Sequence, residues 1–131
     1  MCELVIEAKT EKLEDVLAFL EEHLEEWGCP MKTLTQINIA AEELFVNIAH
    51  YSGSPTATIT LERKGPSAEI TFTDSGTPYN PLEHEDPDVT LSAEERDIGG
   101  LGIYIVKKSM DSVNYEHKDG RNILTIRKTI G

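Results

Sequence analysis

Three glycines stand directly before an apolar stretch in the segment 97–111. Glycine accepts positive φ and lets backbone N–H groups come close to a ligand. After the glycines, Ile103, Val106 and Met110 recur at helical spacing, which predicts a helix that begins there. The first N–H groups of a helix are unpaired and lie at the positive end of its dipole, so Gly99, Gly100 and Gly102 form a candidate phosphate site. A flexible connection is the competing interpretation of this segment taken alone.

Two other places carry polar residues at informative positions. Glu43 and Asn47 lie one turn apart in a predicted helix, so their side chains project along the same edge. Asparagine is a mediocre helix former, so its position inside the helix is a reason to look for a functional role. A hydrogen bond from Asn47 to a nearby loop is the competing structural explanation. His50 continues this edge, and we expect a structural role for it. Asp74 comes where a predicted strand stops, and Gly76 frees the backbone to turn.

Hydrophobic periodicity predicts the elements that must hold these residues. Alternating apolar residues predict strands at 3–8, 56–64, 68–73, 112–117 and 123–128, the last two joined at Asp119-Gly120. Helical spacing predicts helices over 10–27 and from 33 or 35 to 51, besides the one after the glycines. The acidic segment 79–98 has no periodicity, and its length favours a lid over a plain connection.

Composition limits the class of protein. The chain has 131 residues, enough for one domain with a core, and a net charge of −12 from 24 acidic and 12 basic residues. This charge argues against binding to nucleic acids or anionic membranes, and it favours plain solubility over steering toward a basic protein partner. Cys2 and Cys29 form neither a disulfide framework nor a metal-ligand spacing. Without a signal peptide or an apolar span, we expect a cytoplasmic protein.

In chain order, these segments resemble the nucleotide site of the GHKL ATPase superfamily, which joins gyrase, the heat-shock chaperone, histidine kinases and the mismatch-repair ATPase. The sequence looks most similar to the stand-alone anti-sigma factor serine kinases of bacterial partner-switching systems. The resemblance covers nearly the whole chain and is carried by three sequence boxes. The three boxes together, in the right order, are specific for this superfamily, although each box alone is not. The matching segments are Ala41–Tyr51, Asp74–Pro78 and Gly99–Asp111.

The resemblance implies a two-layer α/β sandwich, in which a mixed, mostly antiparallel sheet carries helices on one face. It also implies ATP and Mg²⁺ as ligands. Asp74 would accept a hydrogen bond from the adenine amine beside Gly76, Asn47 would offer its oxygen to Mg²⁺, and Glu43 would act as general base. The phosphates would lie against Gly100, Leu101 and Gly102.

Two features depart from the family pattern. Relatives often carry Gly-Thr at the start of the last strand, with the threonine near adenine. Here the segment reads Asp-Gly-Arg-Asn-Ile-Leu-Thr, so either Asn122 or Thr125 takes that place. Arg96 precedes the glycines at an unusual offset, and we favour a surface role for it over a phosphate contact.

The function that the resemblance implies is phosphorylation of a serine or threonine on an anti-sigma-factor antagonist, with a sigma factor as a further partner and a homodimer as the assembly. A chain of this length has no room for a phosphoacceptor hairpin or for coupling domains. The alternative is a nucleotide-dependent binding module with little or no transfer activity. The presence of Glu43 argues against this alternative, because a protein that only binds needs no general base. A domain cut from a larger signalling protein is a third option, which we rate lower. We expect Asn47→Ala to weaken Mg²⁺-dependent ATP binding, and Glu43→Ala to spare it.

Overall fold

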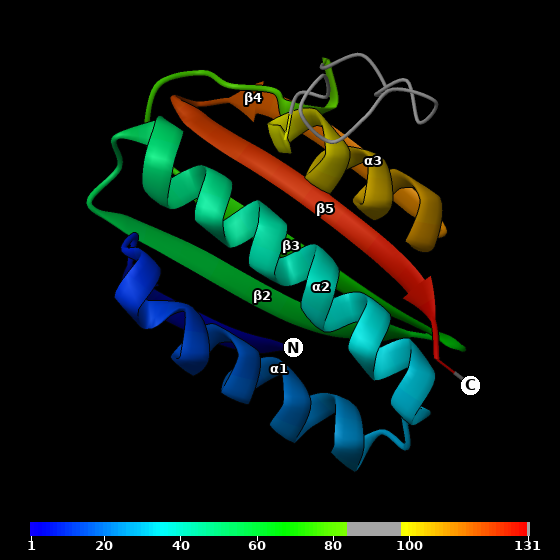
Figure 1. Cartoon of the computed structure of the whole chain (residues 1–131). Coiled ribbons are helices and arrows are strands. Elements are labelled where there is room, and N and C mark those ends of the chain that lie inside the picture. The colour runs from blue at the N-terminus through cyan, green and yellow to red at the C-terminus, as the bar shows by residue number, and fades with distance from the viewer. Residues whose placement is uncertain (84–97, 131) are drawn as a thin grey trace.

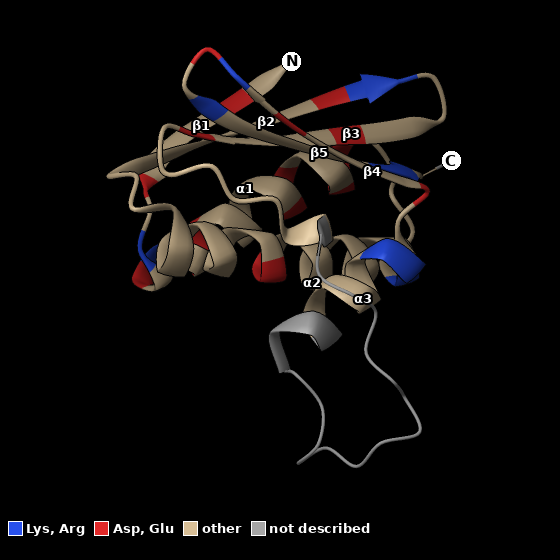
Figure 2. Cartoon of the chain, turned by 90° about the horizontal axis from the view of Figure 1, so that it is seen from above, with Lys and Arg blue, Asp and Glu red and all other residues tan. Residues whose placement is uncertain are grey.

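The computed structural model describes residues 1–83 and 98–130, which form one sheet with helices on a single face (Figure 1). Seen from above, the sheet is one layer and the helices are the other (Figure 2). The strands are β1 (Cys2–Glu7), β2 (Thr56–Lys64), β3 (Ser67–Asp74), β4 (Ser112–Lys118) and β5 (Arg121–Thr129). The helices are α1 (Leu13–Glu26), α2 (Met31–Asn47) and α3 (Ile98–Ser109), with short turns η1 (Thr10–Lys12), η2 (Ile48–Ser52) and η3 (Pro81–Glu83).

The sheet has five strands in the order β1-β2-β3-β5-β4. Every pairing among the described strands is antiparallel, so the expected α/β sandwich is confirmed and its sheet is not mixed. Both predicted hairpins are present. The second one turns at Asp119 and Gly120, whose φ values of 55° and 74° suit a tight two-residue hairpin turn.

The core lies between the sheet and the helices. One face of β2, β3 and β5 contributes alternate residues, as the period of a half-buried strand requires. The helices contribute residues at helical spacing, and α2 packs against both α1 and α3. The largest side chains with almost no exposure include Phe45, Phe72, Leu20, Leu24, Ile37, Ile59, Leu61 and Ile70. None of the helices within the described ranges is long and apolar enough to cross a membrane.

Helix boundaries differ from the prediction at four places. The second helix begins at Met31, after Pro30, and so earlier than the predicted start at 33 or 35. The first helix, predicted from residue 10, opens as the η1 turn, and its α-helical part α1 begins only at Leu13. The α-helical bonding of α2 stops at Asn47, and the chain continues as a π-helical turn that ends at Gly53, whose φ is 72°. A π-helical turn is wider than an α-helical one and is often found at functional sites. The glycines lie inside α3 rather than before it, because α3 begins at Ile98.

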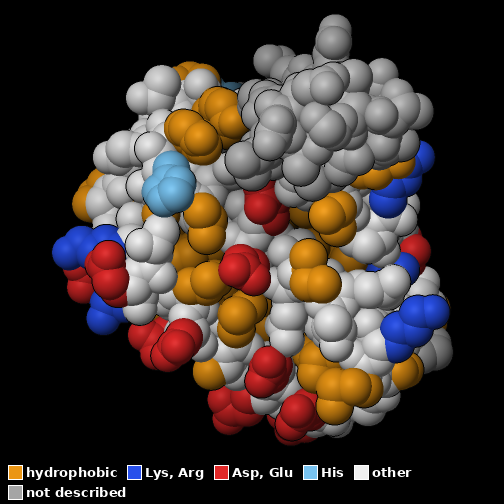
Figure 3. All heavy atoms as spheres, in the orientation of Figure 1, with side chains coloured by type: hydrophobic (Ala, Val, Ile, Leu, Met, Phe, Trp, Pro, Cys, Tyr) orange, Lys and Arg blue, Asp and Glu red, His pale blue; other side chains and the backbone are white. Residues whose placement is uncertain are grey.

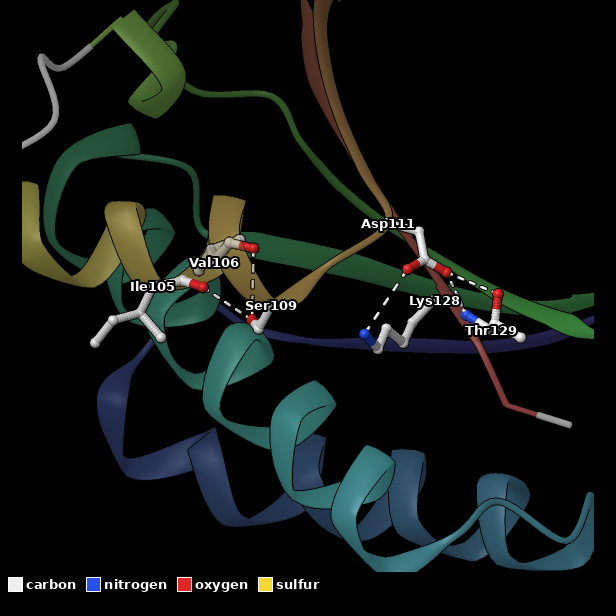
Figure 4. Close-up of polar contacts among 6 residues, drawn as sticks. All are labelled: Ile105, Val106, Ser109, Asp111, Lys128 and Thr129. Carbon is white, nitrogen blue, oxygen red and sulfur yellow. Dashed lines mark hydrogen bonds and ion pairs between the residues drawn. The ribbon is translucent and has the colours of Figure 1, made fainter.

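Asp111 fastens the turn between α3 and β4 to the end of β5 (Figure 4). Its Oδ2 accepts hydrogen bonds from the Thr129 N–H at 2.6 Å and from the Thr129 hydroxyl at 2.8 Å. Lys128 Nζ lies 3.7 Å from the other carboxylate oxygen. The hydrogen bonds from Thr129 hold the pKa of Asp111 below its ordinary value, with a smaller contribution from Lys128.

We predict that Asp111→Asn lowers the free energy of unfolding at pH 7 by about 1 kcal/mol, the usual net value of such a hydrogen bond. Because the folded-state pKa of Asp111 is depressed, its contribution is present above the unfolded-state pKa and is lost as the pH falls through the folded-state pKa. Urea unfolding at pH 7 and in acid measures the difference from wild type. A difference that stays constant into strong acid would contradict this role of the carboxylate.

Candidate functional site

A small cavity lies between α2 and the end of the sheet where β3 stops and β5 begins. Its volume is about 30 Å³, which is room for one or two water molecules. Its walls bring together two of the residues that the sequence singled out, Asn47 and Asp74. Asn122, Tyr79 and Tyr115 line it as well.

Asp74 is the buried carboxylate of this cavity, with an exposed fraction of 6%. As the last residue of β3, it is the register partner of Asn122 at the start of β5. Asp74 Oδ1 accepts hydrogen bonds from the Gly76 N–H at 2.9 Å and from Asn122 Nδ2 at 3.0 Å. A buried charge is tolerated only when donors of this kind compensate for lost hydration.

Thr125 does not lie in this cavity, which corrects one of the predicted contacts. Along β5, Asn122, Leu124 and Ile126 are buried, whereas Thr125 is only partly buried between Leu124 and Ile126. Alternation therefore places Thr125 on the opposite face of the sheet, where its hydroxyl lies 3.2 Å from that of Thr71. Of the two candidates for the threonine position of the family, Asn122 is the one beside Asp74.

Gly76 lies where no side chain fits. A Cβ atom at this position would lie 2.0 Å from the carbonyl oxygen of Ser52 and 2.5 Å from its carbonyl carbon. The same carbonyl oxygen accepts a hydrogen bond from the Thr77 N–H at 2.7 Å. The loop after Asp74 is thereby held against the η2 turn, which fixes the end of α2 relative to the end of β3.

Asn47 lies at the last position of α2 and lines the cavity. Its Nδ2 atom is buried and has no hydrogen-bond partner among the described residues. Because buried amide groups almost always have partners, this one is available to a ligand or to water. The loop contact that would have explained Asn47 structurally is not formed by this atom.

Glu43 lies one turn before Asn47 and meets the start of α3. A Cβ atom on Gly102 would lie 2.1, 2.2 and 2.4 Å from the carboxyl atoms of Glu43, so the carboxyl group occupies the space that the missing side chain leaves. Burial raises the pKa of Glu43, and the charge of the neighbouring Glu42 raises it further. A carboxyl group with a raised pKa is suited to accept a proton near neutral pH.

Gly100 and Leu101 belong to the first turn of α3, the turn whose backbone N–H groups lack helical partners. The structure thus places the start of this helix next to Glu43, through Gly102. Most of the predicted lid, 84–97, lies outside the described residues, and so does Arg96. Of the remaining part, Tyr79 and Pro81 line the cavity. His50 is exposed and contacts Tyr51 edge to face, with ring centroids 6.1 Å apart.

Sequence reasoning missed two residues that shape the site, Tyr115 and Ser52. The hydroxyl of Tyr115 donates a hydrogen bond to Asn122 Oδ1, and its ring forms part of the cavity wall. The carbonyl oxygen of Ser52 accepts a hydrogen bond from the Thr77 N–H. Neither residue type stands out in a strand or at a helix end, and only the register between β4 and β5, which pairs Tyr115 with Leu124, brings the tyrosine to this face.

The residues present fit an adenine nucleotide with Mg²⁺. Asp74 is a buried acceptor, and a helix begins beside Glu43. Asn47 lines the cavity, and the oxygen of its amide is the atom that would hold Mg²⁺. Its Nδ2, which has no partner among the described residues, can only donate a hydrogen bond and so would serve an acceptor atom of the nucleotide. No cluster of three or more His, Cys, Asp or Glu residues suited to a metal occurs in the described ranges. Mg²⁺ needs no such cluster, because it is commonly held by one or two protein groups together with phosphates and water. Fold and site together are those of a nucleotide-binding ATPase domain.

Comparison with known proteins identifies the family. The chain belongs to the histidine kinase-like ATPase domain family, which matches residues 6–128. The chain is 29% identical over 120 residues to the serine/threonine-protein kinase BtrW of Bordetella bronchiseptica, covering 86% of this chain and 82% of that protein.

Solved structures share the fold. The RsbU and RsbW domains from Mycobacterium tuberculosis match with a TM-score of 0.70 at 15% identity, over 99% of this chain, which spans 33% of that longer chain. The SiaB-SiaC complex from Pseudomonas aeruginosa matches with a TM-score of 0.64 at 14% identity, over 99% of this chain and 90% of that one. The catalytic domain of histidine kinase ThkA matches with a TM-score of 0.57 at 15% identity, over 99% of this chain and 98% of that one.

The two close-packed glycines are expected to respond differently to alanine. Gly76→Ala places a methyl group against backbone atoms of Ser52, which cannot move without shifting the η2 turn. We expect a loss of about 2 kcal/mol or more in the free energy of unfolding. Gly102→Ala meets only the end of the flexible Glu43 side chain, and alanine favours a helix, so we expect a change within about 1 kcal/mol.

Urea unfolding of both variants tests this contrast, with each glycine serving as the control for the other. Equal losses for the two variants would contradict the packing described for Gly76.

Proposed function

We propose that this protein is an ATP-dependent serine/threonine-protein kinase that phosphorylates an anti-sigma-factor antagonist. The observation that carries the proposal is the position of Glu43, whose carboxyl group lies against Gly102 in α3 and one turn from Asn47. A candidate base, a candidate metal ligand and a helix start suited to phosphate thus lie together. The sequence similarity to the serine/threonine-protein kinase BtrW supports the same reaction.

In this proposal the nucleotide is bound at both of its ends. Asp74 accepts a hydrogen bond from the exocyclic amine of adenine, because a carboxylate is an acceptor-only group. The N–H groups at the start of α3, from Gly100, Leu101 and Gly102, receive the phosphates. Asn47 holds Mg²⁺, which neutralises phosphate charge when bound. Tyr79, Pro81 and Tyr115 form the wall of the cavity against which the purine would lie.

Glu43 takes the proton from the substrate hydroxyl as its oxygen forms the new bond to phosphorus. The bond between the γ-phosphorus and the bridging oxygen breaks, and ADP leaves with that oxygen. Phosphoryl transfer depends mostly on positioning and charge neutralisation, so the protein needs no covalent nucleophile. The remaining contribution of this chain is to hold Glu43 in a partly buried place, where it retains a raised pKa.

The partner is proposed to be a small protein that presents the hydroxyl, with a sigma factor as a second partner of the same cytoplasmic homodimer. The structural similarity to SiaB, solved in a complex with SiaC, is in keeping with a protein substrate. Acidic side chains gather on the helix-covered face over α1, whereas lysines mark the end of α3 (Figure 3).

The direct test is transfer of labelled phosphate from ATP to candidate antagonists. We predict that Glu43→Gln lowers the transfer rate by at least about a hundredfold, the usual contribution of a general base, while ATP affinity changes little. Asn47→Ala should weaken Mg²⁺-dependent ATP binding. Glu22→Gln, an exposed acid on α1, is the matched control. Tight ATP binding by the wild type without transfer to any antagonist would favour the binding-module alternative.

The pH dependence of transfer follows from the pKa of Glu43. The base must be deprotonated, so the rate should fall on acidification at a pH above that of an ordinary glutamate. Because the charge of Glu42 contributes to the raised pKa, Glu42→Gln should move this acid limb to lower pH. Rate profiles of both proteins between pH 4 and 8, about the range where a raised glutamate titrates, give the measurement. An acid limb that does not move would argue against Glu43 as the titrating base.

A further inference from the structure

Asn122 is the most fully engaged side chain of the cavity. Its exposed fraction is 5%. Its Nδ2 donates to Asp74 Oδ1 at 3.0 Å and to the carbonyl oxygen of Thr77 at 2.9 Å. Its Oδ1 accepts from the Tyr79 N–H at 3.2 Å and from the hydroxyl of Tyr115. Both amide hydrogens and both oxygen lone pairs are thereby used within the protein.

These partners also fix the direction in which the amide points. The nitrogen faces a carboxylate and a carbonyl, which can only accept, whereas the oxygen faces an N–H group, which can only donate. An exchange of the two amide atoms would bring acceptor against acceptor and donor against donor. The hydrogen-bond network therefore allows a single orientation, and in that orientation Asn122 has nothing left to offer a ligand.

We propose that Asn122 is a positioning residue, which holds the carboxylate of Asp74 in the orientation that selects the base of the nucleotide. Asn122 and Gly76 both donate to Oδ1, and Oδ2 is left without a hydrogen-bond partner among the described residues. A carboxylate held in this way presents one acceptor oxygen to an amino group and repels a ring carbonyl at the same place. The inference rests on the proposed function, because it assumes that Asp74 reads a purine.

The same network joins recognition of the base to the cavity wall. Tyr79 and Tyr115 both donate to Asn122 Oδ1, and both residues line the cavity. Binding of a purine must leave the bond from Asn122 to Asp74 in place if base selectivity is to be kept. A displacement of β4 would therefore move Tyr115, and through its hydrogen bond to Asn122 it would alter the orientation of the Asp74 carboxylate.

The experiment measures the affinities of the full chain for ATP and for inosine triphosphate, which carries a carbonyl in place of the adenine amine. Asn122→Leu keeps the approximate size of the side chain and loses both N–H donors, without placing a second carboxyl group beside Asp74. We expect its preference for ATP over inosine triphosphate to fall about tenfold relative to wild type, the effect of one lost hydrogen bond to a charged group. Tyr115→Phe removes one of the two donors to Oδ1 and should lower the preference by a smaller factor.

Thr125→Val is the matched control, because it removes a hydrogen bond from β5 on the opposite face of the sheet. It should leave the preference unchanged. A purely structural role of Asn122 would lower both affinities equally and leave their ratio intact, which would overturn the inference. Should Asn122→Leu fail to fold, an unchanged ratio in Tyr115→Phe would overturn it.

The two proposals fail in different ways. If the wild type binds neither nucleotide, the proposed function fails and the inference falls with it. If the wild type prefers ATP and both variants keep that preference in full, the inference alone fails.

Discussion

A carboxylate buried at the end of a strand is the constraint on which this end of the molecule depends. Asp74 lies between the sheet and the helices, and it needs donors there to compensate for its lost hydration. The donors are the Gly76 N–H and the side-chain amide of Asn122. The register of β3 against β5 cannot slip by one residue without replacing the amide by Arg121 or Ile123. The buried charge thus pins the register of the central strands.

The position of the helices follows from the same constraint. The backbone bends back at Gly76 to donate to Asp74, and this bend brings it against the carbonyl of Ser52, where no Cβ fits. Thr77 then donates to that carbonyl, which fastens the η2 turn and with it the end of α2. Asn47 and Glu43 lie on the last turns of α2, so their distance from Asp74 is set by contacts between backbone atoms. Such contacts are rigid, and catalytic or binding groups held by them keep their geometry.

Much of this arrangement could be predicted from the sequence. The strand periods, the Asp119-Gly120 turn and the order of the three boxes gave the hairpins, the fold class and the family, because these signals are local. The same local reasoning could have decided between Asn122 and Thr125 as the residue near the nucleotide. With Leu124 in the core, period 2 puts residue 122 on the core face and residue 125 on the other. The π-helical turn and Tyr115 were beyond such reasoning, because they depend on tertiary contacts.

Several departures from local rules lie at this one end of the fold, although the buried Oδ1 of Asn38 in the middle of α2 also has no partner among the described residues. Asn47 is a poor helix former whose buried amide nitrogen has no partner in the part of the chain that the structure describes, and Glu43 has its pKa raised by burial. Gly102 lies within a helix, where glycine is intrinsically unfavourable, and α2 ends in a π-helical turn. Away from this end, the hairpin turn at Asp119 and the hydrogen bonds of Asp111 to Thr129 follow the usual preferences of turns and exposed carboxylates. Selection for stability alone would remove such departures, so their common location argues for a ligand site independently of any similarity to other proteins.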